Sequence, residues 1–394
     1  MASMAIPSLD IDLFSQAAIL EPYENYRAVR DAGPLVWLPR HRIFAVGRYK
    51  DVRAVLRDPA RFSSAEGVFF NAAANGQSRG TVIASDGALH DRLRRVIAPP
   101  LFPAAVRALT EGIALEAETL VERLVAQGSF DAVADLAWHL PSTIVTRLVG
   151  LPEEGREGMR EWGLAAFDAG GPAGNARAIA ALSAFQSMYA FVAAPDLPRR
   201  LLPESWSARI FAVAHAGEIE PQQCLSLLID YIAPSLDTTV SGLSSAIWLF
   251  ARHPDQWRIV RENPTLIPRA ILEVLRLETP IRAFTRVATE DADIEGSGLP
   301  SGARVAALYA SANRDERKWT DPDRFDVARE GLNDHLAFGS GQHVCVGMHL
   351  AQLEIKAVLT ALARRVSRFD LGPAERLESN LLRGFAHMPL TVTT

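Results

Sequence analysis

Apolar residues beyond Pro100 recur three or four positions apart, which is the period of an amphipathic α-helix. This spacing, together with many good helix formers, predicts a largely helical body. We expect helices over 103–127, 141–148, 153–167, 176–193, 222–252 and 254–262, and a further apolar helix over 348–359.

Two other parts of the chain follow a β pattern. Residues 35–39 and 42–46 are apolar-rich runs on either side of a charged tight turn, so they predict a small β-hairpin. Residues 291–310 mix β-formers with several glycines and a proline, and predict a second small sheet. The expected fold class is mainly α with small β sheets (α+β). Because neither a repeat nor a low-complexity linker divides residues 1–394, we expect a single domain.

The longest predicted helix, 222–252, is apolar on every side and should be central. Its roughly 30 residues would span about 45 Å. Pro234 lies inside it, lacks an N–H group and clashes with the carbonyl of Asp230, so the helix should kink or open by about one turn. Asp237 and Thr238 then place an acid and a hydroxyl beside that opening. The alternative is an ordinary proline kink in which the threonine hydroxyl bonds to a carbonyl.

Composition limits the class of protein to which the chain can belong. With 394 residues, 48% hydrophobic and 22% charged, the chain can bury a large core. A formal net charge of −5 gives no reason to expect a nucleic-acid partner. The only cysteines, Cys224 and Cys345, exclude a disulfide framework and are typical of a reducing compartment. No run reaches the ~18 apolar residues of a membrane span, so we expect a cytoplasmic monomer.

A glycine-punctuated loop, 338–347, presents Cys345 immediately before the helix expected at 348–359. A thiolate ligand must be deprotonated, and glycines allow backbone N–H groups to approach the sulfur. The positive end of the following helix lowers the thiol pKa further. His343 can donate to an anionic group beside a metal. These residue types suit a metal held by one thiolate; the alternative is a structural cysteine in a turn.

The loop resembles the haem-binding signature of the cytochrome P-450 family. The matching residues are Phe338, Gly339, Gly341, His343, Cys345 and Gly347. The resemblance implies the fold of that family, with a long central distal helix, and haem b whose iron takes the Cys345 thiolate as its axial ligand. It extends over the whole chain, and it leaves Cys224 as a small core residue.

In that family an acid and an alcohol in the distal helix serve oxygen activation. The resemblance therefore implies that Thr238 holds a water molecule and that Asp237 relays protons from solvent. Pro234 and Ser235 stand where the family often has small residues, so the shape of the distal groove departs from the common pattern.

Other matches concern the haem propionates and the support of the cysteine loop. His90 and Arg94, at i and i+4, share a helix face and resemble the family's propionate-binding pair. The remaining residues implied to bind the cofactor are Arg286, His343, Phe338 and Gly339. Glu273 and Arg276, at i and i+3, resemble a buried structural ion pair. Its third member would be Arg324 or Arg329.

The implied activity is that of a haem-thiolate monooxygenase that inserts one oxygen atom of O₂ into a C–H bond. No flavin or iron–sulfur motif is present, so electrons should come from a separate ferredoxin and its reductase. A surface around Arg92, Arg95 and His349 could receive an acidic partner.

The substrate is inferred from a narrower resemblance. Several segments are similar to bacterial members that hydroxylate or O-demethylate para-substituted benzoates. Those members hold the carboxylate with an Arg and a Ser, where this chain has Ile229 and Asp230. Asp230 would repel a benzoate by about 1–3 kcal/mol, so we expect a small neutral aromatic ether or phenol. Phe167 matches an aromatic pocket wall, whereas Gly170 replaces a second aromatic and suggests a wider pocket. The candidate pocket residues are Phe69, Phe70, Phe167, Asp230, Ala233, Pro234, Ile281, Phe284 and Phe385.

Two other functions remain open. A peroxide-driven oxygenase would tolerate the altered groove at Pro234 and Ser235. A haem gas sensor or carrier would not need Asp237 and Thr238, and usually carries an output module.

Overall fold

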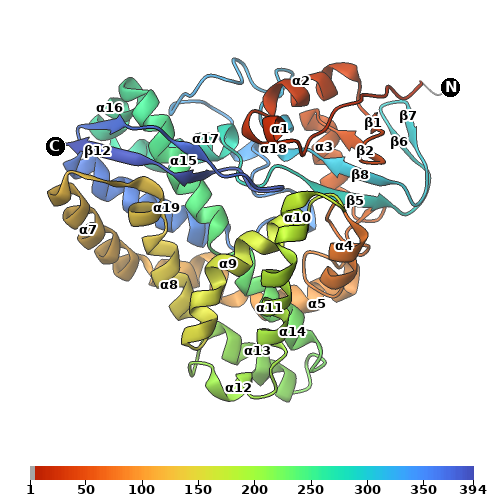
Figure 1. The fold of residues 1–394 in the computed structure, drawn as a ribbon, viewed down its shortest axis with the longest axis horizontal. Coiled ribbons are helices and arrows are strands. Elements are labelled where there is room, and N and C mark those ends of the chain that lie inside the picture. The colour runs from red at the N-terminus through yellow and green to blue at the C-terminus, as the bar shows by residue number, and fades with distance from the viewer. Residues whose placement is uncertain (1–4) are drawn as a thin grey trace.

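The computed structural model describes residues 5–394. A helical body fills most of the molecule, with one small sheet near the N-terminus and another near the C-terminus, at opposite ends of the long axis (Figure 1). The α-helices are α1 Gln16–Leu20, α2 Tyr23–Ala32, α3 Tyr49–Arg57, α4 Ala72–Ser78, α5 Gly87–Ile97, α6 Pro103–Ala108, α7 Thr110–Gln127, α8 His139–Val149, α9 Glu153–Ala169, α10 Ala176–Ala180, α11 Leu182–Val192, α12 Leu197–Arg200, α13 Trp206–His215, α14 Gln223–Ile232, α15 Asp237–Arg252, α16 Pro254–Glu262, α17 Ile267–Leu277, α18 Tyr309–Ala312 and α19 Met348–Arg365. The strands are β1 Val36–Leu38, β2 Ile43–Val46, β3 Phe62–Ser63, β4 Ser129–Asp131, β5 Phe284–Ala288, β6 Ala292–Ile294, β7 Ser297–Leu299, β8 Arg304–Ala307, β9 Arg368–Leu371, β10 Glu375–Arg376, β11 Phe385–His387 and β12 Pro389–Thr393.

The N-terminal sheet confirms the predicted hairpin and corrects the predicted second sheet. Strands β1 and β2 pair antiparallel, with Trp37 opposite Phe44. The sheet continues in the order β1-β2-β8-β5-β3, so β8 joins the first sheet and pairs in parallel with β2. Of the predicted segment 291–310, β6 and β7 alone form a separate two-stranded sheet. The chain reverses between β6 and β7, where Glu295 and Gly296 adopt positive φ values of +53° and +84°. Because of that turn, β8 runs back along β5.

The C-terminal sheet closes the opposite end of the molecule. Strand β12 lies between β4 and β9 and pairs antiparallel with both. It therefore ties the last residues of the chain to the segment between α7 and α8.

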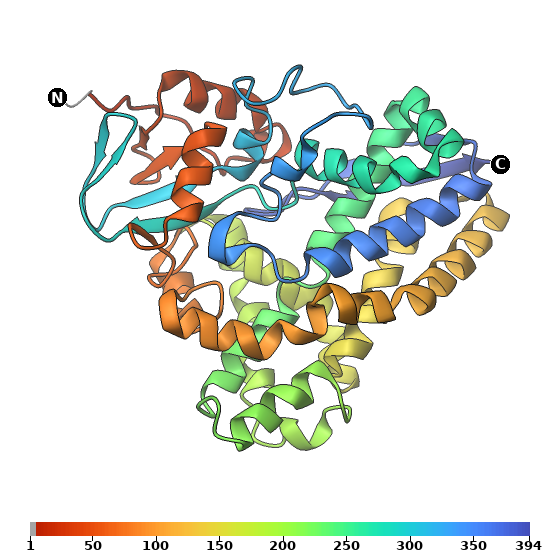
Figure 2. The same ribbon diagram turned by 180° about the vertical axis from the view of Figure 1, so that it is seen from behind.

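The core lies between long helices that are remote in sequence. Helices α7 and α19 run side by side, as Figure 2 shows from behind. Helix α19 also packs against α15 and α17. This packing holds the start of α19, and with it the loop that carries Cys345, against the centre of the molecule.

Several helix predictions are confirmed, whereas two segments predicted as single helices each form two helices. Helix α16 has the predicted bounds, and α8 and α9 extend the predictions by one or two residues at their ends. The predicted helix 103–127 is broken at Leu109 (ψ −7°), and 176–193 is broken at Ala181 (ψ −16°). A ψ near zero departs from the helical value of about −42° and turns the axis. Apolar spacing continues across both breaks because both sides pack on the core, so the pattern contains no sign of the bend.

The predicted central helix opens at Pro234. Helix α14 ends at Ile232 and α15 begins at Asp237, so about one turn of non-helical chain separates them. This confirms the effect expected of the proline. Within the described residues, no helix is both long and apolar enough to cross a membrane.

Candidate functional site

The cysteine loop has the backbone conformations that its glycines predicted. Gly339 and Gly341 both lie in the left-handed region, at φ +73° and +76°. A Cβ on Gly341 would lie 2.7 Å from the Leu56 carbonyl oxygen, so only glycine allows this approach to α3. The Cys345 N–H donates to the Phe338 carbonyl (2.9 Å) and closes the loop.

Cys345 is exposed, and backbone N–H groups of the residues that follow it approach its sulfur. Desolvation by neighbouring protein atoms raises the pKa of the thiol, while the N–H groups of Gly347 and Met348 and the charge of Arg94 act against that rise. An exposed cysteine whose sulfur is approached by two N–H groups and a cation fits an axial ligand of a metal group.

His90 supplies a second test of whether a haem group fits. The side chain is 2% exposed, yet its Nε2 has no hydrogen-bond partner. An orphaned buried nitrogen beside the cysteine loop is what a propionate acceptor would satisfy. The His90 ring packs edge-on against His343, with centroids 4.6 Å apart.

Asp86 fixes the second histidine. Its Oδ1 lies 3.2 Å from His343 Nε2. Burial would raise the pKa of Asp86, but bonds from His343, Ser63 and two backbone N–H groups outweigh it and hold the pKa at about 2. The sequence contains no periodic sign of this contact, because Asp86 and His343 are far apart in the chain.

The two arginines expected near the propionates differ in their contacts. Arg94 donates to the carbonyls of Gln342 (3.2 Å) and Val344 (2.7 Å), so it braces the cysteine loop itself. Arg286 is 3% exposed in β5 and donates to the Thr285 carbonyl (2.8 Å). The structure thus brings His90, Arg94, His343 and Cys345 together around one loop.

The acid and the alcohol lie where the helix opens. The Thr238 hydroxyl donates to the Pro234 carbonyl (2.9 Å), and the Ser235 hydroxyl donates to the Tyr231 carbonyl. Thr238 therefore has the carbonyl-bonded geometry of the structural alternative. Asp237 is 6% exposed, and its Oδ2 has no hydrogen-bond partner. Burial raises the pKa of Asp237 to about 7, although the charge of Arg160 opposes the rise.

Most candidate pocket aromatics form one cluster. Buried Phe167 packs in it with the partly buried Phe69 and Phe284, whose ring centroids are 6.0 Å apart. Gly170 does not widen this region as expected, since a Cβ there would lie 2.5 Å from the Phe69 ring. The Phe69 ring fills the space left by the missing side chain.

The remaining candidates lie around and outside that cluster. Ile281 packs against it, and Phe70 turns toward the N-terminal segment, with its ring 4.8 Å from that of Phe14. Phe385 belongs to the main helical core and packs on Trp248 at 5.5 Å. Ala233 is half-buried and Pro234 is exposed in the opened turn.

Asp230 makes a contact that the sequence did not predict. Its Oδ2 accepts a hydrogen bond from the Val82 N–H (2.7 Å), which ties α14 to the segment between α4 and α5. Burial raises the pKa of Asp230 to about 7, against the effect of that bond.

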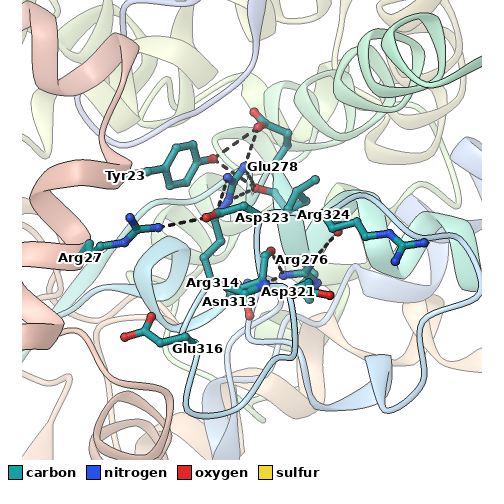
Figure 3. Close-up of polar contacts among 12 residues, drawn as sticks. Tyr23, Arg27, Arg276, Glu278, Asn313, Arg314, Glu316, Asp321, Asp323 and Arg324 are labelled. Atoms are coloured by element: carbon teal, nitrogen blue, oxygen red, sulfur yellow. Dashed lines mark hydrogen bonds and ion pairs between the residues drawn. The ribbon is translucent and has the colours of Figure 1, made fainter.

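The predicted structural ion pair is confirmed, and its third member is Arg329. Arg276 donates to both oxygens of Glu273, at 2.7 and 2.9 Å, and neither side chain is exposed to solvent. Arg329 Nε donates to the same carboxylate at 2.9 Å. Arg324 contributes only its carbonyl, which accepts from Arg276 and Arg329. Arg276 also donates to the Asn313 carbonyl at 2.8 Å (Figure 3).

A second buried cluster was missed by the sequence analysis. Glu278, which directly follows the last residue of α17, pairs with Arg314, Arg376 and Arg383 at 2.9–3.1 Å. Burial works to raise the pKa of Glu278, but these three guanidiniums lower it to about 2. Tyr23 donates to the Leu277 carbonyl at 3.1 Å and adds α2 to the group (Figure 3). In the sequence, the sign of this cluster is Glu278 itself, an acidic residue directly after the amphipathic helix that ends at Leu277.

The fold and the site together define a haem-thiolate protein: an exposed thiol on a donor-backed loop, an unpartnered buried histidine nitrogen beside it, and an acid with an alcohol at an opened helix. A model of the cytochrome P450 family matches residues 208–386. Cytochrome P450 CYP199A2 of Rhodopseudomonas palustris is 36% identical to this chain, over 98% of it and 95% of the relative. Linalool 8-monooxygenase of Pseudomonas putida is 31% identical over 96% of both chains. The solved structure of cytochrome P450 CYP109Q5 from Chondromyces apiculatus has a TM-score of 0.82 at 27% identity and covers 98% of both.

The chain belongs to the cytochrome P450 family. It is a monooxygenase, and it binds haem b through an axial cysteine thiolate, as members of this family do.

Proposed function

We propose that this protein inserts one oxygen atom of O₂ into a C–H bond of a small neutral aromatic compound, by hydroxylation or O-demethylation, as a single cytochrome P450 domain. The observation that carries the proposal is the opened turn before α15, which carries Thr238 and sets Asp237 against α9, the helix that contributes Phe167 to the aromatic cluster. When bound, haem supplies the thiolate-ligated iron at which O₂ is activated.

The protein side chains would hold the cofactor and control protons. Cys345 would be the axial ligand, and His90 Nε2 and Arg286 would face the propionates. Thr238, whose hydroxyl can leave the Pro234 carbonyl, would hold a water molecule. Asp237, with a pKa of about 7, can both accept and release a proton near neutral pH.

The preference for a neutral substrate rests on Asp230. Because its pKa lies at about 7, Asp230 is partly ionised at neutral pH. A carboxylate substrate close to it would face repulsion or force it to take up a proton, whereas a phenol or ether would not. Phe69, Phe167 and Phe284 provide aromatic walls for such a ring.

A basic surface supports electron delivery by an acidic ferredoxin. A hollow of about 570 Å³ is lined by Arg107, Arg269, His349 and Lys356, and no acidic side chain of the described residues lines it. His349 comes four residues after Cys345 and was expected in such a surface. Arg92 and Arg95, on α5, are exposed as well. Opposite charge would orient the donor close to the thiolate loop.

One set of assays tests the proposal. Haem-loaded protein should consume NADH and oxidise 4-methoxyphenol when a ferredoxin and its reductase are added. Equal turnover on hydrogen peroxide alone would instead identify a peroxide-driven oxygenase. Absence of product under both conditions would exclude 4-methoxyphenol as a substrate.

A Soret-shift titration tests the substrate class. Methoxyphenols should bind more tightly than 4-methoxybenzoate, and Asp230→Asn should tighten benzoate binding by roughly tenfold, as removal of 1–3 kcal/mol of repulsion predicts. Benzoate binding as tight as that of methoxyphenols in the unmodified protein would contradict the preference for a neutral substrate.

A further inference from the structure

Gly163 in the middle of α9 faces the opened turn before α15. It is buried, and a Cβ built on it would lie 2.2 Å from Asp237 Oδ2 and 3.3 Å from the Ala233 carbonyl oxygen. Carbon and oxygen atoms that are not bonded stay about 3.3 Å apart or more. The carboxylate of Asp237 therefore occupies the position that any larger residue would fill.

Two charged residues of α9 act on the Asp237 carboxyl, whose Oδ2 has no hydrogen-bond partner. The charge of Arg160, one turn earlier on α9, lowers the pKa of Asp237, and the charge of Asp168, later on the same helix, raises it. Arg160 also stacks on Trp138, 4.8 Å from the ring centroid. Arg160, Trp138, His139 and Leu236 line a hollow of about 610 Å³ that opens to the outside. The hollow therefore includes Leu236, the residue before Asp237, and Arg160, whose charge acts on the Asp237 carboxyl.

We propose that Gly163 is a positioning residue for Asp237, and that the notch left by its missing side chain seats the carboxyl against α9 on the side of Arg160 and this hollow. The inference deepens the proposed function and rests on it for its consequence, because the seated carboxyl is the one that would receive protons from solvent. It assigns a role to a residue of α9 that has no reactive group.

Gly163→Ala tests the seating directly. The added methyl group must displace the carboxyl from its buried position. The proton affinity of Asp237 should then fall at least roughly tenfold, toward the ordinary aspartate pKa of about 4. Infrared titration of haem-loaded, substrate-free protein measures the pKa of Asp237 from the C=O stretch of its protonated carboxyl group. That band is identified by its loss in Asp237→Asn. Gly112→Ala is the matched control, since Gly112 is an exposed helical glycine of α7 whose added Cβ would meet nothing within 4 Å.

A double-variant cycle covers the case in which Gly163→Ala folds poorly. Alanine is a better helix former than glycine, so Gly163→Ala should raise the melting temperature once the carboxyl is removed by Asp237→Ala. In the presence of Asp237 it should lower the melting temperature. Equal effects of Gly163→Ala with and without Asp237, including failure to fold in both, would overturn the proposal, as would an unchanged Asp237 titration.

The test also separates this inference from the proposed function. If Asp237→Asn leaves product yield per NADH unchanged, the proton-relay role fails. The infrared titration and the cycle of melting temperatures still decide whether Gly163 seats the carboxyl.

Discussion

The ring of His90 packs edge-on against that of His343 at 4.6 Å, and while His343 is held by Asp86, the Nε2 of His90 has no partner. Asp86 thus fixes His343, whereas the buried Nε2 of His90 is left to bond with a group outside the protein chain. A haem propionate would complete that arrangement.

Removal of His90 should therefore weaken haem retention. We expect His90→Ala to release haem to an acceptor protein roughly ten- to hundredfold faster, because one bond to a charged group contributes about 1.5–3 kcal/mol. The exposed His215, at the end of α13, provides the control, and His215→Ala should leave the rate unchanged. Equal rates in the two variants would remove His90 from the propionate site.

The two cysteines should differ completely in their effect on the cofactor. Cys345→His or Cys345→Ser should abolish the absorption band that the reduced carbon monoxide complex shows when thiolate is the ligand. Cys224→Ala should keep it, since Cys224 is buried in α14 among apolar side chains. The opposite result would show that the ligand is Cys224.

Arg329 and Arg324 should contribute differently to the free energy of unfolding, because the Arg329 side chain bonds to buried Glu273 and the Arg324 side chain is exposed. Loss of the Arg329 side chain leaves part of the Glu273 carboxylate unpaired in the core, so Arg329→Met should lower the free energy of unfolding by about 3 kcal/mol. Arg324→Met should change it by less than about 0.5 kcal/mol, because the Arg324 side chain is exposed. Chemical denaturation measures both, and similar losses would contradict the assignment of Arg329 as the third member.

Thr238 and Pro234 should affect coupling of electrons to product differently. If Thr238 holds the water molecule, Thr238→Ala should bind haem and substrate normally but divert NADH to hydrogen peroxide, while Thr238→Ser should retain most product. Pro234→Ala should restore a helical hydrogen bond with a smaller loss of coupling. Measurement of NADH consumed, peroxide and product tests this, and unchanged coupling in Thr238→Ala would leave the threonine a structural residue.

Asp237 should make stability depend on pH. Its folded pKa of about 7 exceeds the unfolded value near 4, so the native state binds the proton more tightly. This contribution to stability is complete below about pH 4 and is lost as the pH rises through about 7. Asp237→Asn, which stays neutral, should therefore be more stable than the unmodified protein by about 2–4 kcal/mol at pH 8 and equal to it at pH 4.

Denaturation of both proteins at the two pH values checks this prediction. The pKa of Asp230 is also raised to about 7, so its contribution to the free energy of unfolding should likewise be lost as the pH rises. Asp230→Asn therefore serves as a comparison. A constant difference between Asp237→Asn and the unmodified protein from pH 4 to 8 would contradict a raised pKa for Asp237.

Features that depend on neighbours within a turn or two could be predicted from the sequence. The loop that presents Cys345, the hairpin of β1 and β2, the Glu273–Arg276 pair and the opening at Pro234 all follow from local spacing and backbone chemistry, and all appear in the structure. A glycine that needs a positive φ or a proline without an N–H acts on the chain whatever surrounds it.

Contacts between distant segments were decided only by the tertiary structure. The choice of Arg329 over Arg324, the arginines around Glu278, the pairing of β8 with β2 and the notch at Gly163 join residues far apart in sequence. The bends at Leu109 and Ala181 belong with them, because packing on both sides keeps the apolar period unbroken. Such contacts depend on which surfaces meet after folding, and neither periodicity nor propensity along the chain carries that information.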